Sequence, residues 1–462
     1  MKPSPLHPKR SASISYASSP AKRARSVSVS VKVSHDSTPG KVLHEPEIPV
    51  RPKNPQACLG GVPEELLLYI LKKLRGNPAA LAKLCRTDRR CRRIAEEVLY
   101  NKVPAYAGAK ARAIIATSRL ALHVHSCSAE VIDDFDHPDY GKDKFTRIIA
   151  KAINIRTLSI RNFSVWRAEY PDDEQWSLNW LSLFDSATRQ SVNNSVNSFS
   201  YLSDLTIAGD YITVEKISSV FRLPSLKAFQ LDGVHQTTPF ENWSIPNSSC
   251  PIQTLKLMDT MMDITAVTQI ISAMKALRNF TYIRNTFAWQ PFGSDQNALS
   301  NWPVHSWKLL GDALRKHQDS LETVLAWDIS DKDIIDIVYP DGHNFGTLGS
   351  FRAFPNLKHC GWHIEAFLNV AAGEDDLSSY LPPNLRSFDI QISADISTLW
   401  AGHLSSLASL RNVKSVHLAW DGDLPTPALS NPLEILEQAG IELVLDINGK
   451  RVNVKQLKRL EE

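Results

Sequence analysis

Hydrophobic and polar positions repeat along most of the chain in a six-residue unit whose first, fourth and sixth residues are apolar. A clear copy is Leu226-Lys-Ala-Phe229-Gln-Leu231. Further copies begin at Ile155, Leu202, Ile252, Leu277, Leu321, Leu357, Leu385 and Val413, and a looser one spans residues 441–447. Because side chains alternate between the two faces of a strand, each copy predicts a short strand with its fourth and sixth residues in the core.

The spacing of these copies predicts a repeat architecture. Successive copies begin 47, 24, 26, 25, 44, 36, 28, 28 and 28 residues apart. Most intervals fall in the range of roughly 20–29 residues that is typical of leucine-rich repeats. The longer intervals predict insertions near residues 161–201, 283–320 and 329–350, and helices are expected at 214–222, 264–274 and 307–317. A flavodoxin-like sheet also alternates strands with helices, but it lacks a uniform six-residue unit.

Residues 59–103 follow a helical spacing instead. Pro63 suits a first helical turn, and two glutamates follow it at the positive end of the helix dipole. Leu66, Ile70 and Leu74 form an apolar stripe, and two further short helices are expected before residue 103. Such a unit is marginal by itself unless a partner covers it. The alternative is a three-helix cap on a larger domain, since apolar stripes more often pack in a core.

The charge of the chain is unevenly distributed. Residues 1–57 carry ten Lys/Arg and three Asp/Glu, a net charge of +7, and residues 58–102 carry ten and five, a net charge of +5. Since the whole chain has a net charge of +3, residues 103–462 carry −9. The basic segment after residue 58 suits an acidic partner, whereas the acidic remainder disfavours nucleic-acid binding.

Residues 1–57 are predicted to be disordered, because Ser, Pro, Lys and Arg dominate them. Two basic clusters have the spacing of a bipartite nuclear-import signal, formed by Lys9, Arg10, Lys22, Arg23 and Arg25. The alternative is a solubilising arm, so we expect a location in the nucleus and/or cytoplasm. No uncharged run reaches the roughly 20 residues needed to cross a bilayer, and the six cysteines form no Cys-x-x-Cys pair. These features favour a reduced intracellular protein without a membrane partner.

Catalytic motifs are not found. The chain has no Gly-x-Ser-x-Gly elbow, no Walker loop and no His-Glu-x-x-His pair. His359, Cys360 and His363 are close in sequence, but alternation along a strand sends Cys360 to the face opposite His359. The acidic stretch 133–139 lacks the fixed spacing of a calcium loop. We therefore expect a non-catalytic protein without a cofactor or metal.

The segment 59–103 resembles the F-box, whose opening reads Leu-Pro-x-Glu-Leu, then Ile-Leu, then Leu. The residues that match or replace these are Val62, Pro63, Glu65, Leu66, Ile70, Leu71 and Leu74. Residues 89–100 resemble the end of the F-box in many fungal proteins, with Cys91 where an aromatic residue is usual. Together with Pro-Asn-Leu phrases at residues 355–357 and 383–385, the chain resembles leucine-rich-repeat F-box proteins of the irregular fungal type.

This resemblance implies an α/β fold in which a disordered tail and a short three-helix F-box precede an irregular leucine-rich-repeat solenoid. The expected parts are a tail over 1–57, the F-box over 58–103 and a helical linker with a first repeat over 104–154. Degenerate repeats over 155–450 and a C-terminal tail over 451–462 complete the chain.

The function implied is target recognition in an SCF-type (Skp–cullin–F-box) ubiquitin ligase. The F-box would bind the Skp-type adaptor, and through it the cullin, with Val62, Pro63, Leu66, Ile70, Leu71, Leu74, Leu81 and Leu84. A protein target would bind the concave sheet, where alternation exposes Gln230, Lys256, Thr281, Leu325, Trp327, His359, Asp389 and His417, with Leu325 and Trp327 as anchors. The alternatives are a nuclear scaffold that binds the adaptor without delivering targets, and an enzyme with an unrecognised site.

Overall fold

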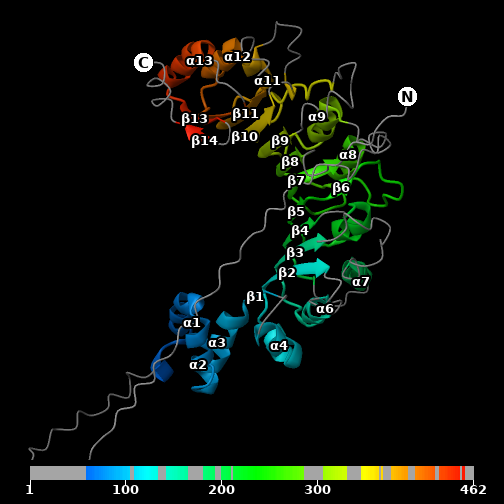
Figure 1. The fold of residues 1–462 in the computed structure, drawn as a ribbon, viewed down its shortest axis with the longest axis vertical. Coiled ribbons are helices and arrows are strands. Elements are labelled where there is room, and N and C mark those ends of the chain that lie inside the picture. Colours follow the sequence, from blue (N-terminus) through cyan, green and yellow to red (C-terminus); the bar gives the residue numbers. More distant parts are fainter. Residues whose placement is uncertain are drawn as a thin grey trace, which may run out of the picture. The chain divides into compact units, whose positions relative to one another are not determined.

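The computed structural model describes most of the chain after residue 58 (Figure 1). The described residues are 59–104, 109–133, 142–164, 181–192, 199–209, 212–285, 305–329, 345–363, 366–367, 376–393, 401–421, 426–447 and 450–452. The predicted tail, with the import residues Lys9, Arg10, Lys22, Arg23 and Arg25, lies outside them. Residues 134–139 of the acidic stretch also lie outside the described residues. So do large parts of the three expected insertions and the C-terminal tail from residue 453.

Three short helices open the described chain. They are α1 (Glu64–Lys73), α2 (Pro78–Leu84) and α3 (Arg89–Tyr100), with single turns η2 (Leu59–Gly61) and η3 (Leu74–Gly76) beside α1. Asn77 caps α2 by accepting a hydrogen bond from the Ala80 amide at 3.0 Å, and Asp88 caps α3 at the Arg90 and Cys91 amides. The helices enclose a small core of their own, composed of Leu67, Leu71, Leu81, Cys91, Ile94, Ala95, Val98 and Leu99.

After these helices, the strands of the described chain form one sheet and follow one another in chain order. They are β1 (Lys102–Pro104), β2 (Ser126–Asp133), β3 (Thr157–Ser164), β4 (Asp204–Gly209), β5 (Ala228–Asp232), β7 (Thr254–Met262), β8 (Asn279–Asn285), β9 (Thr323–Ile329), β10 (His359–His363), β11 (Ser387–Ser393), β12 (Ser415–Asp421), β13 (Glu442–Ile447) and β14 (Lys450–Val452). Neighbouring strands of this order pair in parallel from β1 to β13, and β14 pairs antiparallel to β13. The short β6 (His235–Gln236) pairs with β7. This is the mixed α/β arrangement expected of stacked strand–helix repeats.

Helices connect the strands and lie along one side of them in Figure 1. They are α4 (Ala109–Ala116), α5 (Ser118–Ala121), α6 (Lys142–Lys151), α7 (Ser182–Val192), η5 (Glu215–Arg222), α8 (Ile264–Ala273), α9 (Trp307–Arg315), α11 (Leu377–Tyr380), α12 (Ala401–Ser406), η10 (Leu407–Ser409) and α13 (Thr426–Gln438). The helices predicted at 264–274 and 307–317 are found as α8 and α9, whereas the one at 214–222 is the 3-10 helix η5. Among the described helices, none has the length and hydrophobicity required to cross a membrane.

The strands at the two ends of the sheet differ from the six-residue pattern of the sequence. Residues 122–125 lead into a strand that begins only at Ser126, and β1 joins the sheet already at Lys102. The last repeat is shifted by one residue, because Glu442 aligns with Ser415. Leu443 and Leu445 therefore take the fourth and sixth positions, and Leu445 is buried.

The six-residue unit determines which side chains enter the core. Leu357, Cys360 and Trp362, at the first, fourth and sixth positions of one copy, are fully buried, and His359 between them is half-buried. The same inward positions of the other copies contribute to one continuous apolar core. The predicted alternation is therefore found along the sheet, and Cys360 lies on the face opposite His359.

A backbone ladder ties each copy to the next at the second position of the unit. The carbonyl of Lys358 accepts hydrogen bonds from the amides of Arg386 and Ser387, and that of Arg386 accepts from Lys414 and Ser415. Equivalent paired bonds begin at Asn101 and continue through every copy to Arg386. Each strand thus begins at the third position, in register with its neighbours.

A second ladder uses the residue just before each unit. Asn356 donates its side-chain amide to the Asp319 carbonyl at 2.8 Å, Asn384 donates to Pro355 at 3.1 Å and Asn412 donates to Pro383 at 2.8 Å. Asn154 and Ser225 make the equivalent bonds in earlier copies, and Ser320 donates instead to the carbonyl of Leu277, the first residue of the preceding copy. These side chains fix the turn that leads into each strand by bonding it to the preceding turn.

Removing one of these side chains should weaken the stack. We expect Asn384→Ala to lower the free energy of unfolding by about 1 kcal/mol, the usual net contribution of one hydrogen bond. Urea unfolding followed by circular dichroism measures this, with Asn247→Ala as the control, since Asn247 is exposed and lies in a connecting segment. Equal unfolding midpoints for the two variants would contradict a structural role of the ladder.

Candidate protein-interaction surfaces

The helix α1 has one buried and one exposed apolar side. Leu67 and Leu71 enter the small helical core, whereas Leu66, Tyr69 and Ile70 are 55%, 60% and 42% exposed. Among the described residues, four of the seven exposed large hydrophobic side chains lie between Leu59 and Ile70, a concentration far above chance along the chain. We call Leu66, Tyr69 and Ile70 the α1 patch.

The residues predicted to bind an adaptor fall into three groups. Leu66 and Ile70 belong to the α1 patch, and Pro63 is exposed at the start of the helix. Val62, Leu74 and Leu84 are half-buried and pack partly on the small core. Leu71 and Leu81 are each only 1% exposed and lie in the small helical core, so their contact with an adaptor stays a prediction. Their surface is already used to hold α1 and α2 against α3.

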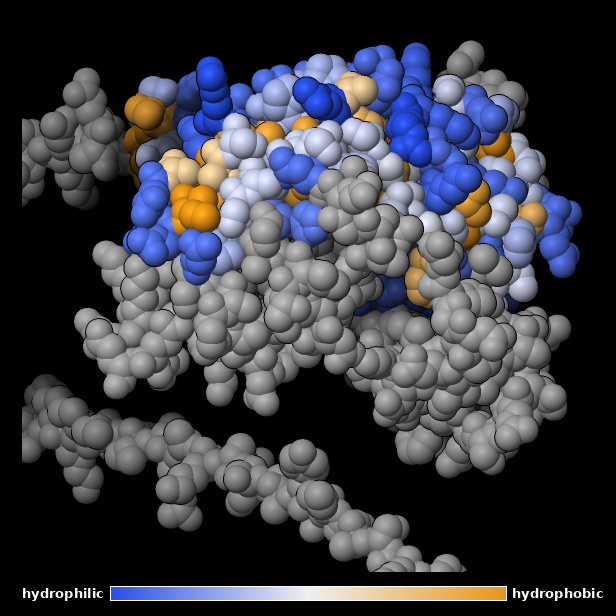
Figure 2. All heavy atoms as spheres, turned by 90° about the horizontal axis from the view of Figure 1, so that it is seen from above, coloured by the Kyte–Doolittle hydropathy of each residue, from blue (hydrophilic) through white to orange (hydrophobic). Residues whose placement is uncertain are grey.

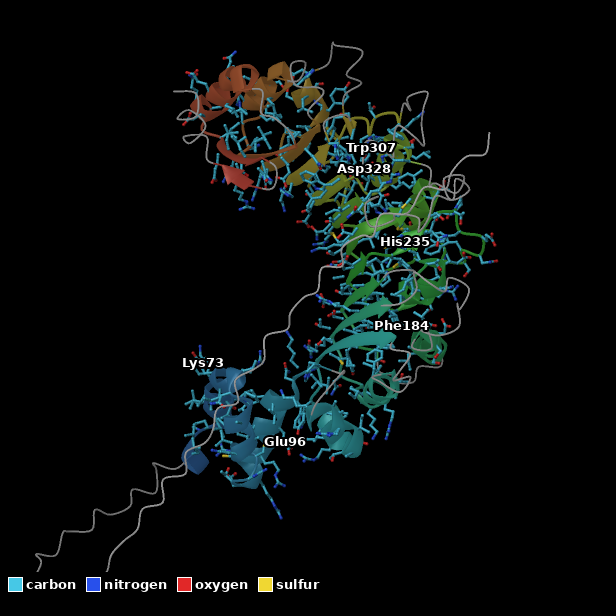
Figure 3. All side chains as sticks on the ribbon, in the orientation of Figure 1. Lys73, Glu96, Phe184, His235, Trp307 and Asp328 are labelled. Carbon is cyan, nitrogen blue, oxygen red and sulfur yellow. The ribbon has the colours of Figure 1, made fainter. Side chains whose placement is uncertain are left out.

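Positive charge surrounds the α1 patch. Lys72, Lys73 and Arg75 are exposed where α1 ends, and the Lys73 ammonium lies 5.3 Å from the centre of the Tyr69 ring. Figure 3 labels Lys73 on this helix. Glu64, at the other end of α1, is paired with Arg93, and the hydrogen bond from that guanidinium lowers the pKa of Glu64. One of the two glutamates in the first turn of α1 is thus paired, and the basic residues at the other end of the helix are exposed.

The second candidate surface is the face of the sheet opposite the helices, formed by the third, fifth and seventh positions of each copy, which we call the open face. Six of the eight predicted residues lie in one row across neighbouring strands, in which Gln230 aligns with Lys256, Thr281 and Leu325. Trp327 and His359 lie on the same face at the seventh and third positions. The row continues through Gly361 to Asp389 and His417. Lys256 is exposed and the other predicted residues of this face are half-buried, as expected for side chains on an uncovered sheet.

Gly361 allows three larger side chains to meet on the open face. A Cβ atom at Gly361 would lie 2.6 Å from Leu325 Cδ2, 2.9 Å from Asp389 Cβ and 3.4 Å from Trp327 Cζ2. These distances mean that Leu325, Trp327 and Asp389 occupy the space a side chain would fill. The two predicted anchor residues therefore lie together, beside a carboxylate.

A short polar chain adjoins this cluster. The His359 imidazole lies 3.3 Å from Asp389 through Nε2 and 2.8 Å from the Ser387 hydroxyl through Nδ1. An Nε2–H tautomer satisfies both contacts, because Asp389 accepts its proton and Nδ1 accepts from Ser387. On the described residues of the face drawn in Figure 2, hydrophilic side chains predominate and hydrophobic ones form small separate areas. Apolar anchors beside hydrogen-bonding groups are the composition expected of a protein-recognition surface.

A buried polar cluster lies behind β8 and β9 and was not predicted from the sequence. Arg284 is 1% exposed and pairs with Asp328 at 2.8 Å, and His305 lies 4.0 Å from the same carboxylate. Trp307, labelled with Asp328 in Figure 3, packs edge-on against His305 at 4.4 Å. Arg284 and Asp328 occupy the same inward position of adjacent strands, and this shared position was the signal available in the sequence.

Metal-ligating groups do not gather in the part of the chain that the structure describes, where no three His, Cys, Asp or Glu side chains are placed to hold an ion. The described cysteines are unpaired, and burial raises the pKa of the Cys360 thiol and that of Cys250, the latter to about 11. These thiols therefore act as small apolar core residues.

Comparisons with known proteins identify the repeats. Residues 202–384 match the family model for a leucine-rich repeat domain. Among solved structures, a chain from the crystal structure of the Rad7 and Elc1 complex in yeast matches with 12% identity, covering 82% of this chain and 92% of that chain, at a TM-score of 0.32. A search of curated proteins gives no match.

The close contacts at Gly361 predict an intolerance to side chains. We expect Gly361→Ala to lower the free energy of unfolding by about 1–3 kcal/mol, because the new Cβ atom would overpack Leu325 and Asp389. Gly76→Ala is the matched control, since its Cβ atom would meet no atom within 4 Å. Thermal unfolding compares the two variants, and an unchanged melting temperature for Gly361→Ala would show that the anchors do not close over the glycine.

The buried imidazole of His305 predicts a pH dependence of stability. Burial lowers its pKa from 6.5 to about 3, with Arg284 adding to the effect. Since the unfolded chain takes up this proton first, the contribution of neutral His305 is complete above about pH 6.5 and is lost as the pH falls toward 3.

His305→Phe keeps the ring contacts and removes the titrating group. Between pH 6.5 and 4 we expect this variant to lose less stability than the parent, by up to about 1.4 kcal/mol per pH unit. Urea unfolding at a series of pH values measures the difference, and other acid-sensitive groups cancel because both proteins carry them. If the free energy of unfolding changes with pH in the same way for the parent and for His305→Phe, His305 is not held neutral in the folded protein.

Proposed function

We propose that the protein is the non-catalytic, target-recognising subunit of an SCF-type ubiquitin ligase. In this proposal the α1 patch binds a Skp-type adaptor, the adaptor links the chain to a cullin, and the open face of the repeats binds a protein target. The chain contributes proximity between the target and a ubiquitin-charged enzyme rather than a reacting group of its own. We propose the nucleus and/or the cytoplasm as the site of action.

The observation that carries the proposal is the exposure of Leu66, Tyr69 and Ile70 on a helix whose other side is fully packed. Exposing three large apolar side chains to water is unfavourable, at about 25 cal/mol per Å² of apolar area, and a docked partner removes this cost. The three lie within one turn or so of α1, at the spacing by which a helix presents anchors to a groove. The resemblance of residues 62–74 to the F-box opening names a Skp-type adaptor as that partner.

The charge around the patch supports an acidic partner. Residues 58–102 carry ten Lys/Arg and five Asp/Glu. Two of the acidic groups, Glu64 and Glu96, are already paired with Arg93 and Arg119. The cations at the end of α1 therefore act on an approaching partner largely uncompensated, which favours rapid association with an acidic surface.

Replacing the exposed anchors should abolish adaptor binding without unfolding the chain. We expect Leu66→Asp with Ile70→Asp to weaken binding to a purified Skp-type adaptor by about a hundredfold or more, since about 2 kcal/mol per hot-spot residue corresponds to roughly thirtyfold for each. Calorimetric titration measures the affinity. The control is Leu122→Asp with Leu309→Asp, because these leucines are each 44% exposed elsewhere.

The outcomes separate docking from packing. Leu71→Ala is expected to lower stability by about 2–5 kcal/mol, because Leu71 is buried. Equal adaptor binding by the α1-patch variant and the parent would remove the basis of the proposal.

A further experiment tests target delivery. If deletion of residues 59–103 leaves the abundance of every protein bound by the repeats unchanged, the chain is a scaffold rather than a ligase subunit.

A further inference from the structure

A row of positive charge follows the beginning of the strands. The second position of successive copies, whose carbonyls form the backbone ladder, is occupied by Arg156, Ser203, Lys227, Gln253, Arg278, Glu322, Lys358, Arg386 and Lys414. Six of these nine residues are basic and one is acidic, although residues 103–462 together have a net charge of −9. All six basic residues are exposed. We call Lys358, Arg386 and Lys414, in three consecutive copies, the basic row.

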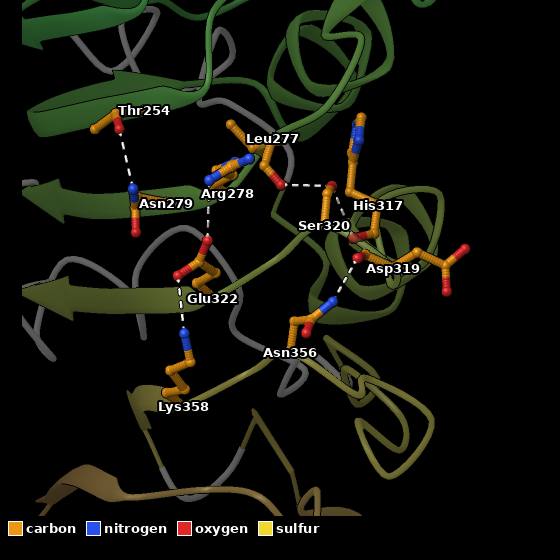
Figure 4. A network of polar contacts seen from close by, with 10 residues as sticks. All are labelled: Thr254, Leu277, Arg278, Asn279, His317, Asp319, Ser320, Glu322, Asn356 and Lys358. Atoms are coloured by element: carbon orange, nitrogen blue, oxygen red, sulfur yellow. Dashed lines mark hydrogen bonds and ion pairs between the residues drawn. The ribbon is translucent and has the colours of Figure 1, made fainter.

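Glu322 marks one end of the basic row. Its carboxylate pairs with Arg278 at 3.4 Å on one side and with Lys358 at 3.1 Å on the other, as Figure 4 shows. Arg278 is thus neutralised, and Lys358 shares the same carboxylate. Arg386 and Lys414 have no carboxylate within 4 Å among the described residues, so most of the positive charge of the row is uncompensated there.

The placement of these cations is unfavourable for the free protein. Neighbouring strands lie about 4.8 Å apart, and the residues after each cation, His359, Ser387 and Ser415, are directly aligned. Like charges directly opposite each other across strands destabilise a sheet. An anion bound between them removes this repulsion, so the row is arranged for a negatively charged ligand.

The hydrogen-bonding groups beside the row suit the same ligand. Ser387 and Ser415 follow Arg386 and Lys414 on the open face, and both are half-buried. The Ser415 hydroxyl, beside the Lys414 ammonium, is an ordinary hydrogen-bond donor to phosphate and carboxylate oxygens, whereas the Ser387 hydroxyl already donates to His359. The apolar anchors Leu325 and Trp327 lie farther along the strands, at the fifth and seventh positions of their copy.

We propose that the basic row binds the anionic groups of an acidic target segment, phosphates or clustered carboxylates, while an apolar side chain of the same segment contacts Leu325 and Trp327. This inference rests on the proposed function, since it specifies what the open face recognises. Five residues separate the second and seventh positions, a distance of roughly 17 Å along a strand at about 3.3 Å per residue. An extended segment therefore carries its anionic group and its apolar anchor about five or six residues apart.

A protein segment fits the row better than a nucleic acid. Three cations in consecutive copies span roughly 10 Å, given strands about 4.8 Å apart, which matches one or two anionic groups rather than a long backbone. The net negative charge of residues 103–462 opposes the approach of a polyanion. The apolar anchors further favour a peptide that offers both kinds of side chain.

The test measures binding of the full-length protein to three degenerate twelve-residue peptide pools by fluorescence anisotropy. Each pool has a fixed leucine and, six residues away, a fixed phosphoserine, glutamate or serine. A single-stranded oligothymidine of similar length is the fourth probe. We expect the phosphoserine or the glutamate pool to bind more tightly than the serine pool and less tightly as salt rises. Whichever of these two pools binds better identifies the source of the anion.

Two charge-reversal variants test whether the anionic peptides bind at the basic row. Arg386→Glu with Lys414→Glu should weaken anionic-pool binding about tenfold or more. Lys275→Glu with Lys308→Glu, which changes the charge equally at exposed positions outside the row, should leave it unchanged. The inference is overturned if the serine pool binds as well as both anionic pools, if the two variants behave alike, or if the oligothymidine binds more tightly than the peptides.

Adaptor binding separates this inference from the proposed function. Both charge variants should bind the purified Skp-type adaptor as the parent does. If the parent protein binds the adaptor but binds the three peptide pools equally well, the basic row alone is overturned. Loss of adaptor binding in the α1-patch variant, with the peptide preference retained, supports both parts of the account.

Discussion

The structure depends on hydrogen bonding between successive repeats at the start of each strand. From Asn101 to Arg386, each second-position carbonyl accepts hydrogen bonds from two amides of the following copy, and where Asn stands before the unit its side chain bonds to the preceding turn. This double connection holds the strands in register wherever the repeat length changes. Insertions between strands are tolerated because the contacts at the strand starts do not depend on the length of the connecting segment.

The two candidate surfaces differ in how many of their apolar residues the neighbouring core can bury. In the repeats the first, fourth and sixth residues of each unit are buried in the continuous core. The open face therefore carries mainly polar side chains, with a few apolar anchors around Gly361. In α1 the apolar residues exceed what three short helices can bury, and Leu66, Tyr69 and Ile70 remain outside. The small unit of helices α1 to α3 thus keeps an exposed apolar side, whereas the repeats bury most of their large apolar residues.

Much of the fold could be predicted from the sequence, because alternation and helical spacing are local properties. The strands β3 to β5 and β7 to β12, and the helices α1 to α3, α8 and α9, were accessible in this way, whereas β14 lies partly in the segment predicted as a C-terminal tail. The start of β2, the burial of Leu71 and Leu81, and the pairing of Arg284 with Asp328 depend on which segments pack together. The resemblance assigned Leu66, Leu71, Leu74, Leu81 and Leu84 to one docking face, and packing separates the exposed Leu66 from the buried Leu71 and Leu81.

Hydrogen–deuterium exchange of the full-length protein, with and without a purified Skp-type adaptor, tests the central claim most directly. The account predicts slower amide exchange in peptides covering α1, residues Glu64–Lys73, with the exchange of the strands β8 to β11 unchanged. Unchanged exchange in α1 at saturating adaptor, or protection confined to the repeat sheet, would contradict the assignment of separate adaptor and target surfaces.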